Sequence, residues 1–245
     1  MIDENIAIHA DNLGICFRMP TEPISGTKDL FVRAVQKKIH INKFWALRNI
    51  SFDLERGNSI GIMGRNGAGK STLLKVIARV LTPKEGRIVV RGKVFPMLEL
   101  GAGFNPDLTG HENIYLYGNI LGLTNDEVTR LYDGIVDFSE IGSFIHAPLR
   151  SYSSGMVARL AFATATAVQP DLLLADEILS VGDAAFQEKC LARMKGYLSS
   201  GTTIVFVSHS ADTVKEICNT GLWLEHGQAK LFGSAAEVAD AYAAS

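Results

Sequence analysis

The stretch from Gly64 to Ser71 has the residue types and spacing of a loop that binds nucleotide phosphates. It reads Gly-Arg-Asn-Gly-Ala-Gly-Lys-Ser and matches the pattern G-x-x-x-x-G-K-[ST] at every fixed position. Small residues let consecutive backbone N–H groups point into one concavity, and a helix that begins there adds the positive end of its dipole. We expect the Lys70 ammonium to meet the β- and γ-phosphates and the Ser71 hydroxyl to bind Mg²⁺. The residues expected to surround the nucleotide at this loop are Gly64, Arg65, Asn66, Gly67, Ala68, Gly69, Lys70, Ser71 and Thr72.

The segments on either side predict the elements that position this loop. Residues 59–63 form a short apolar run that is typical of a buried strand, and residues 72–79 predict a helix. The alternative is a chance glycine-rich turn, but such a turn has no need of a strand before it and a helix after it. The sequence therefore predicts that the chain binds a nucleoside triphosphate.

Two adjacent carboxylates follow a second apolar run. Residues 172–175 predict a buried strand, and Asp176 and Glu177 come directly after it. We expect Asp176 to hold Mg²⁺, directly or through a water molecule, and Glu177 to polarise the water that attacks the γ-phosphate. The alternative is that both are solvated acids at the end of a strand.

A histidine follows a third apolar run. Residues 203–207 predict another buried parallel strand, and His209 lies two positions beyond it. Ligands of open α/β sheets bind at the carboxyl ends of the strands, so His209 is placed to reach the γ-phosphate. Taken alone, such a histidine would be ordinary surface or helix-cap chemistry, and the two other phosphate motifs favour the catalytic interpretation.

Residues 151–156 predict a second site for anions. They read Ser-Tyr-Ser-Ser-Gly-Met and lead into an apolar helix, whose N-terminus attracts negative charge. One nucleotide does not need two such sites on one chain. A symmetric dimer resolves this, because each copy can close its second site over the nucleotide of the other.

The order of the predicted elements indicates an α/β fold with a mostly parallel sheet. Residues 6–9 and 45–54 predict strands ahead of the phosphate loop, and residues 221–231 predict a hairpin with its turn at Gly227. A mostly helical block from about 105 to 168 interrupts the alternation, and we expect it to be an inserted helical subdomain.

Composition narrows the class of protein. The chain has 245 residues, enough for one domain with a subdomain, and a net charge of −2 gives no electrostatic case for nucleic acid. Cys16, Cys190 and Cys218 lie far apart without metal-ligand spacing, which suggests a reducing compartment. No secretory signal is evident at the N-terminus. The most apolar stretch, 160–168, is far shorter than the roughly 20 residues of a spanning helix.

Taken together, these motifs resemble the ATPase subunit of an ATP-binding cassette transporter over nearly the whole chain, in the right order and spacing. The resemblance implies one cassette domain over 1–245, with a mixed sheet and an N-terminal antiparallel β part. It makes Gly64 to Ser71 the Walker A loop, 172–176 the Walker B strand and His209 the switch histidine. It also makes Glu177 and Lys70 catalytic, and implies ATP and Mg²⁺ as cofactors.

The same resemblance assigns residues to the nucleotide of a second copy. The signature is Tyr-Ser-Ser-Gly-Met at 152–156, where most relatives have Leu-Ser-Gly-Gly-Gln, and the D-loop lies at 180–183. Serine replaces glycine and methionine replaces glutamine, yet a hydroxyl and a glycine backbone still reach a phosphate. The residues implied to act across the dimer are Ser153, Ser154, Gly155 and Asp183.

Segments 44–47, 98–105, 151–156 and 181–187 are similar to ATPases that export polysaccharides, closest to exporters of lipid-linked O-antigen and near those of teichoic acid and capsule. This narrower resemblance implies a second copy of the chain, two copies of a polytopic transmembrane permease and a lipid-linked glycan as the transported substrate, with no nucleic acid. It implies a peripheral position on the cytoplasmic face of the inner membrane. Many relatives carry a second, β-rich sugar-binding domain, and we expect none here.

One position departs from the family pattern, and the choice of the residue that stacks on adenine stays open. Glu99 stands where most cassettes have glutamine, and we expect its carboxylate to contact Mg²⁺. The aromatic residue that stacks on adenine is expected to be Phe17, with Phe44 or Trp45 as alternates, although core packing is the better interpretation for Trp45.

Residues 28–40 predict a basic amphipathic helix, which fits either the membrane-proximal gate helix of this subfamily or a surface helix packed on the sheet. Two rival functions remain. A soluble cassette ATPase acting on DNA or ribosomes usually has a long coiled coil or two cassettes, and a P-loop kinase has no use for 151–156.

Overall fold

The structure is a computed structural model that describes residues 3–20, 41–97, 100–176 and 182–245. Its larger sheet has the strand order β5-β6-β7-β3-β8-β9, and all neighbours are parallel except the antiparallel pair β8 and β9. Its strands are β3 (Ser59–Met63), β5 (Val94–Met97), β6 (Leu172–Asp176), β7 (Thr203–Val207), β8 (Thr220–Glu225) and β9 (Gln228–Ser234). Strands β3 and β7 are buried along their whole length, which explains their continuous apolar sequences.

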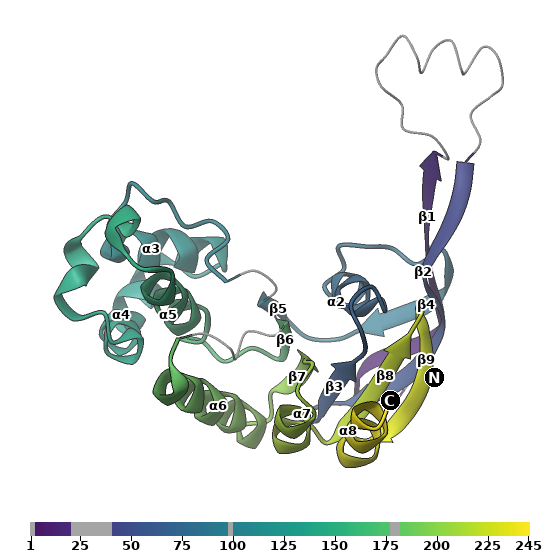
Figure 1. Cartoon of the computed structure of the whole chain (residues 1–245). Coiled ribbons are helices and arrows are strands. Elements are labelled where there is room, and N and C mark those ends of the chain that lie inside the picture. Colours follow the sequence, from purple (N-terminus) through teal and green to yellow (C-terminus); the bar gives the residue numbers. More distant parts are fainter. Residues whose placement is uncertain (1–2, 21–40, 98–99, 177–181) are drawn as a thin grey trace, which may run out of the picture.

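A smaller antiparallel sheet is built from the first two strands and β4, in the order β2-β1-β4. Its strands are β1 (Ile6–Pro20), β2 (Ile41–Glu55) and β4 (Glu85–Val90). Strands β1 and β2 pair from Ile6↔Glu55 to Pro20↔Ile41, well beyond the runs that the sequence predicted. The far end of this pair projects from the body of the protein (Figure 1).

Helices cover both faces of the larger sheet (Figure 1). Helix α2 (Lys70–Ile77) packs on one face in a core that includes Leu73 and Leu47, together with the smaller sheet. On the other face lie α6 (Ala184–Ser199), α7 (Ala211–Ile217) and α8 (Ala235–Ala243), around a second core. Alternating residues of β3 and β7 belong to the two cores, as the two-residue period of a strand requires.

The segment between β5 and β6 is helical and has a core of its own. Its elements are α3 (Gly110–Ile120), α4 (Asn125–Ser139), the 3₁₀ turns η1 (Gly142–His146) and η2 (Leu149–Ser151), and α5 (Ser154–Ala165). Capping boxes at Thr109/Glu112 and Thr124/Glu127 start the first two helices. In Figure 1 this helical region lies at the opposite end of the molecule from the projecting strands.

The predicted fold class is confirmed: a mixed α/β sheet, an antiparallel N-terminal part and an inserted set of helices. The hairpin predicted around Gly227 is confirmed as β8 and β9. The helix predicted for 28–40 lies outside the described residues. Within the described parts of the chain, no helix is both long and apolar enough to cross a membrane.

Candidate functional site

Three of the predicted motifs meet at one edge of the larger sheet. Strand β7 lies between β3 and β6 and is parallel to both, so the carboxyl ends of all three face the same edge. The phosphate loop follows β3, Asp176 ends β6, and His209 comes two residues after β7. Val207 is the register partner of both Ile62 and Asp176, so the strand that leads into the phosphate loop and the strand that ends at Asp176 flank β7, each about one strand spacing, ~4.8 Å, away.

Gly69, the residue of the phosphate loop just before α2, has a backbone conformation and surroundings that only glycine fits. Gly69 is the N-cap of α2 and has φ 107°, a left-handed conformation that residues with a Cβ rarely adopt. A Cβ on Gly69 would lie 2.7 Å from Leu47 Cδ2 and 2.8 Å from the Ala46 carbonyl oxygen. Strand β2 therefore packs directly against the loop, and this contact sets where α2 begins.

Lys70, the first residue of α2, turns its side chain back into the loop. It is only 7 % exposed, and its Nζ donates to the carbonyl oxygens of Gly64 at 2.6 Å and Arg65 at 3.3 Å. His209 Nε2 lies 3.3 Å from the same Nζ. Because an ammonium only donates, a hydrogen bond between the two groups requires His209 Nε2 to be the acceptor. The structure thus brings two predicted catalytic residues together although 139 positions separate them.

The predicted Mg²⁺ ligands divide between described and undescribed residues. Ser71 is exposed in the first turn of α2, and Asp176 is half-buried at the end of β6. A hydroxyl and a carboxylate at one sheet edge are the hard oxygen donors that suit Mg²⁺, which takes few protein ligands beside phosphate oxygens and water. Glu99 and Glu177 lie outside the described residues.

The signature turn has the geometry of a capped helix N-terminus. Ser153 is the N-cap of α5, and its hydroxyl accepts the N–H of Met156 at 3.2 Å. Ser153 and Ser154 are exposed and Gly155 is half-buried, so a phosphate outside the chain has access to them. In Figure 1 strands β5 and β6 lie between α5 and α2, which keeps the signature helix apart from the phosphate loop of its own chain.

Asp183 is tied to the signature helix. Its carboxylate caps α6 by accepting the N–H of Phe186 at 3.0 Å, and it accepts from Arg159 Nη2 at 2.7 Å. The Phe186 N–H, and then the charge of Arg159, hold the pKa of Asp183 below its usual range. Arg159 also donates to Glu140 at 3.1 Å. We did not predict Arg159 from the sequence, although the signal was present, since it is the one charged residue of α5.

Replacing Arg159 with leucine is expected to lower ATP turnover several-fold while ATP affinity stays unchanged, because α5 would lose its link to α6. A steady-state ATPase assay and equilibrium ATP binding measure the two effects. Arg150→Leu is the matched control, since it breaks an exposed ion pair with Asp107 in the same helical region. Equal turnover in the two variants would show that the link from Arg159 to Asp183 does not contribute to hydrolysis.

The same pair predicts a pH dependence. Because the pKa of Asp183 is lowered, its contribution to stability is present above the pKa of an unfolded aspartate and is lost as pH falls through the lowered folded pKa. The difference in melting temperature between the parent and Asp183→Asn should therefore be present at neutral pH and vanish in acid. A difference that persists after Asp183 is protonated would contradict this.

The candidate adenine residues lie where β1 and β2 pass the loop. Phe17 pairs with Phe44 and Cys16 with Trp45 in the strand register. Phe17 is 37 % exposed and Phe44 50 %. Trp45 is half-buried, and the Arg48 guanidinium lies 5.1 Å from its ring centre. Because Trp45 already has protein neighbours, the geometry favours the phenylalanines for stacking on a base.

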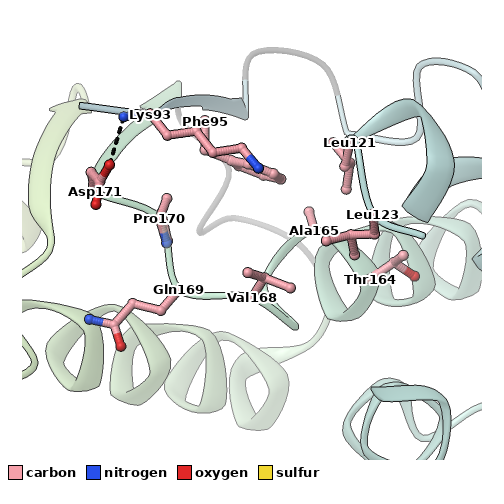
Figure 2. A pocket seen from close by; sticks show the side chains of 10 residues that line it. All are labelled: Lys93, Phe95, Leu121, Leu123, Thr164, Ala165, Val168, Gln169, Pro170 and Asp171. Carbon is pink, nitrogen blue, oxygen red and sulfur yellow. Dashed lines mark hydrogen bonds between the residues drawn. The ribbon is translucent and has the colours of Figure 1, made fainter. Parts of the chain in front are cut away.

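A separate cavity of about 90 Å³ lies between the helical region and β5 (Figure 2). Its lining is mostly apolar and includes Phe95, Leu121 and Leu123. Lys93 and Asp171, also in its wall, precede β5 and β6, so this cavity lies at the opposite edge of the sheet from the phosphate loop. It does not belong to the nucleotide site.

Comparison with known proteins agrees with this geometry. The family model described as ABC transporter matches residues 47–180. The chain is 44 % identical over 221 residues to the O-antigen export system ATP-binding protein RfbB of Klebsiella pneumoniae, covering 89 % of each chain. It is 41 % identical to the teichoic acids export ATP-binding protein TagH of Bacillus anthracis over 92 % of this chain and 40 % of that protein.

Solved structures show the same fold. A dimeric ATP-binding cassette in a post-hydrolysis state bound to ADP and phosphate superposes with a TM-score of 0.72 at 21 % identity, over 93 % of this chain and 98 % of that one. The ATP-binding subunit of an ABC transporter gives a TM-score of 0.73 at 20 % identity, over 97 % and 93 % of the two chains. On the family match and the identity to RfbB, the chain belongs to the ABC transporter family and carries its ATP-binding cassette.

Proposed function

We propose that the chain is the ATP-hydrolysing subunit that powers export of a lipid-linked, O-antigen-like polysaccharide across the cytoplasmic membrane. The observation that carries the choice of cargo is the 44 % identity, over 89 % of both chains, to a protein named for O-antigen export. A Myxococcus xanthus protein with the same name is 48 % identical over 80 % of this chain. The 41 % identity to a teichoic acid export protein makes teichoic acid the second candidate cargo, with capsule or another glycan as further alternatives.

The chemistry follows from the sheet edge that holds Lys70, Asp176 and His209. Lys70 would bind the β- and γ-phosphates with the backbone of Gly64 to Gly69, and Phe17 would stack on adenine. Mg²⁺ held by Ser71 and Asp176, with Glu99 beside them, would neutralise charge on the phosphates. Glu177 would take a proton from the attacking water as general base.

His209 would orient the γ-phosphate during hydrolysis. This role is supported by its Nε2, which is 3.3 Å from Lys70 Nζ, the group proposed to bind the same phosphate. Two ATP molecules would sit between the phosphate loop of one copy and Ser153–Gly155 of the other, with Asp183 beside that contact.

His209→Ala is expected to lower ATP turnover by about a hundredfold while changing ATP affinity little, because its role belongs to the reaction rather than to binding. Turnover and equilibrium binding of ATP are measured on the same preparation. The control is His146→Ala, a change at an exposed histidine of the helical region. A variant that lost affinity and turnover in equal measure would make His209 a binding residue instead.

We further propose that the chain works as a single cassette with a helical subdomain near 105–168. It would lie on the cytoplasmic face of the membrane beside two copies of a polytopic permease, without nucleic acid. Residues 28–40 would form a helix near the bilayer. The permease would dock near 99–104 and convert dimer closure into movement of the glycan.

Co-purification with the membrane partner, followed by an ATPase assay with and without lipid-linked glycan, tests this function. We expect the complex to form and the glycan to stimulate turnover. If only a teichoic acid precursor stimulated ATP turnover, teichoic acid would be the transported substrate. Failure to associate with any membrane protein, with turnover intact, would favour a cassette ATPase that works outside transport.

A further inference from the structure

We propose that Gly227, in the turn of the C-terminal hairpin, is a positioning residue for the phosphate loop. The inference rests on the nucleotide site proposed at Gly64 to Ser71 and adds a residue from the other end of the chain. Gly227 lies outside every motif that defines that site. Its contacts with the loop are made through its backbone, so they leave little trace in the sequence.

The turn is a two-residue connection between β8 and β9. Glu225 pairs with Gln228, and the two residues between them, His226 and Gly227, have φ of 48° and 76°. Positive φ at both positions is the signature of a type I′ turn, which matches the twist of a hairpin. This geometry aims Gly227 at the body of the protein, where it is buried.

Gly227 makes one backbone hydrogen bond on each side. Its N–H donates to the carbonyl oxygen of Ala68, in the phosphate loop, at 3.1 Å. Its carbonyl oxygen accepts the N–H of Arg48, in β2, at 2.8 Å. Gly227 therefore links the phosphate loop to β2, the strand that packs against the same loop.

The bond to Ala68 controls a donor of the phosphate site. The carbonyl of Ala68 and the N–H of Gly69 belong to one planar trans peptide, so they point in opposite directions. Holding the carbonyl toward Gly227 directs the N–H of Gly69 away from the hairpin, which leaves it available to a phosphate bound in the loop. Backbone N–H groups in this orientation are what a phosphate loop presents to its ligand.

The space around this contact is filled by backbone. A Cβ on Gly227 would lie 2.6 Å from the carbonyl oxygen of Ala46. A Cβ on Gly64 would lie 2.3 Å from the carbonyl oxygen of Leu224, in β8. Neither oxygen is the end of a flexible side chain, so a larger residue at either glycine moves the loop or the hairpin. A cavity of about 140 Å³ beside the contact, lined by Arg65 and Trp223 among others, leaves room for the loop to shift.

The proposal is tested by replacing Gly227 with alanine and with asparagine, and the same two replacements at Gly201 are the controls. Gly201 also has a left-handed backbone, φ 87°, but a Cβ there would meet nothing within 4 Å. We expect Gly227→Ala and Gly227→Asn to weaken ATP binding by about tenfold or more, because small displacements at such sites have large effects. Both Gly201 variants should bind ATP like the parent. Asparagine tolerates the left-handed conformation, so its effect at 227 reports the contact with Ala46 rather than backbone strain.

Equilibrium binding of ATP is measured on folded protein, with melting temperatures recorded beside it. If the Gly227 variants bind ATP as the Gly201 variants do, while Lys70→Met binds ATP about tenfold or more weakly than the parent, the inference is overturned and the nucleotide site stands. If Lys70→Met binds ATP like the parent, the proposed nucleotide site is wrong, and the inference about Gly227 is then wrong as well.

Amide hydrogen exchange of the unmodified protein decides the matter if the Gly227 variants do not fold. ATP should slow exchange of the Gly227 N–H together with the loop amides, because their shared hydrogen bond is held in place by the ligand. Slower exchange of the loop amides with no change at Gly227 would overturn the proposal.

Discussion

Replacing Lys70 with methionine is expected to weaken ATP binding by about ten- to a hundredfold. Methionine keeps the length of the side chain but removes the charge that would meet the β- and γ-phosphates. A hydrogen bond to a charged group contributes about 1.5–3 kcal/mol, and this range sets the expected loss of affinity. Turnover should fall further, by about another hundredfold, because charge on the transferred phosphoryl group needs a fixed donor in the transition state.

Equilibrium ATP binding and steady-state hydrolysis measure the two parts of this effect. Lys75→Met is the matched control, because Lys75 lies on the same helix but is exposed in its last turn. The Lys70 ammonium also satisfies the carbonyls of Gly64 and Arg65, so melting temperatures are needed to separate lost function from lost folding. A folded Lys70→Met protein with parental turnover would contradict the assignment of the phosphate loop.

Glu177→Gln is expected to lower the rate of hydrolysis by about a hundred- to ten-thousandfold while ATP still binds. Glutamine has the shape of glutamate, but its amide does not take a proton from the attacking water. Single-turnover hydrolysis with excess protein isolates this step from product release. Glu188→Gln, at an exposed glutamate of α6, controls for the loss of one negative charge.

Hydrolysis by Glu177→Gln at the parental rate would place the general base elsewhere. Asp176→Asn separates the two neighbouring carboxylates. We expect it to weaken the Mg²⁺ dependence of ATP binding, because Asp176 is proposed as a ligand rather than as a base. If Glu177→Gln rather than Asp176→Asn changed the Mg²⁺ requirement of ATP binding, Glu177 would be the Mg²⁺ ligand and Asp176 the general base.

The phosphate loop was predictable because its information is local. Pattern, preceding strand and following helix occupy one stretch of sequence. The strand Ser59–Met63 is confirmed, and the helix predicted for 72–79 is present as Lys70–Ile77, so it begins and ends two residues earlier. The strands that end at Asp176 and Val207 were also visible as short apolar runs. Their order was not, because the position of β7 between β3 and β6 depends on pairing between distant segments.

Contacts between segments that are distant in the sequence account for most of what the sequence did not reveal. Strands β1 and β2 extend further than their apolar runs because they pair with each other along polar residues such as Arg18 and Lys43. Arg159 stood out as a charge in an apolar helix, but its partner Asp183 is on another element. Gly227 was predicted as a turn residue, whereas its bond to Ala68 is visible only in three dimensions.

Two copies of the chain are proposed to complete each nucleotide site together. The most direct measurement is the molar mass of Glu177→Gln in solution by light scattering, with saturating ATP and Mg²⁺ and again with ADP. We expect a dimer with ATP and a monomer with ADP, and loss of the ATP-dependent dimer when Ser153→Arg is added. A protein that stays monomeric with ATP bound, or that dimerises equally with Ser153→Arg, would contradict it.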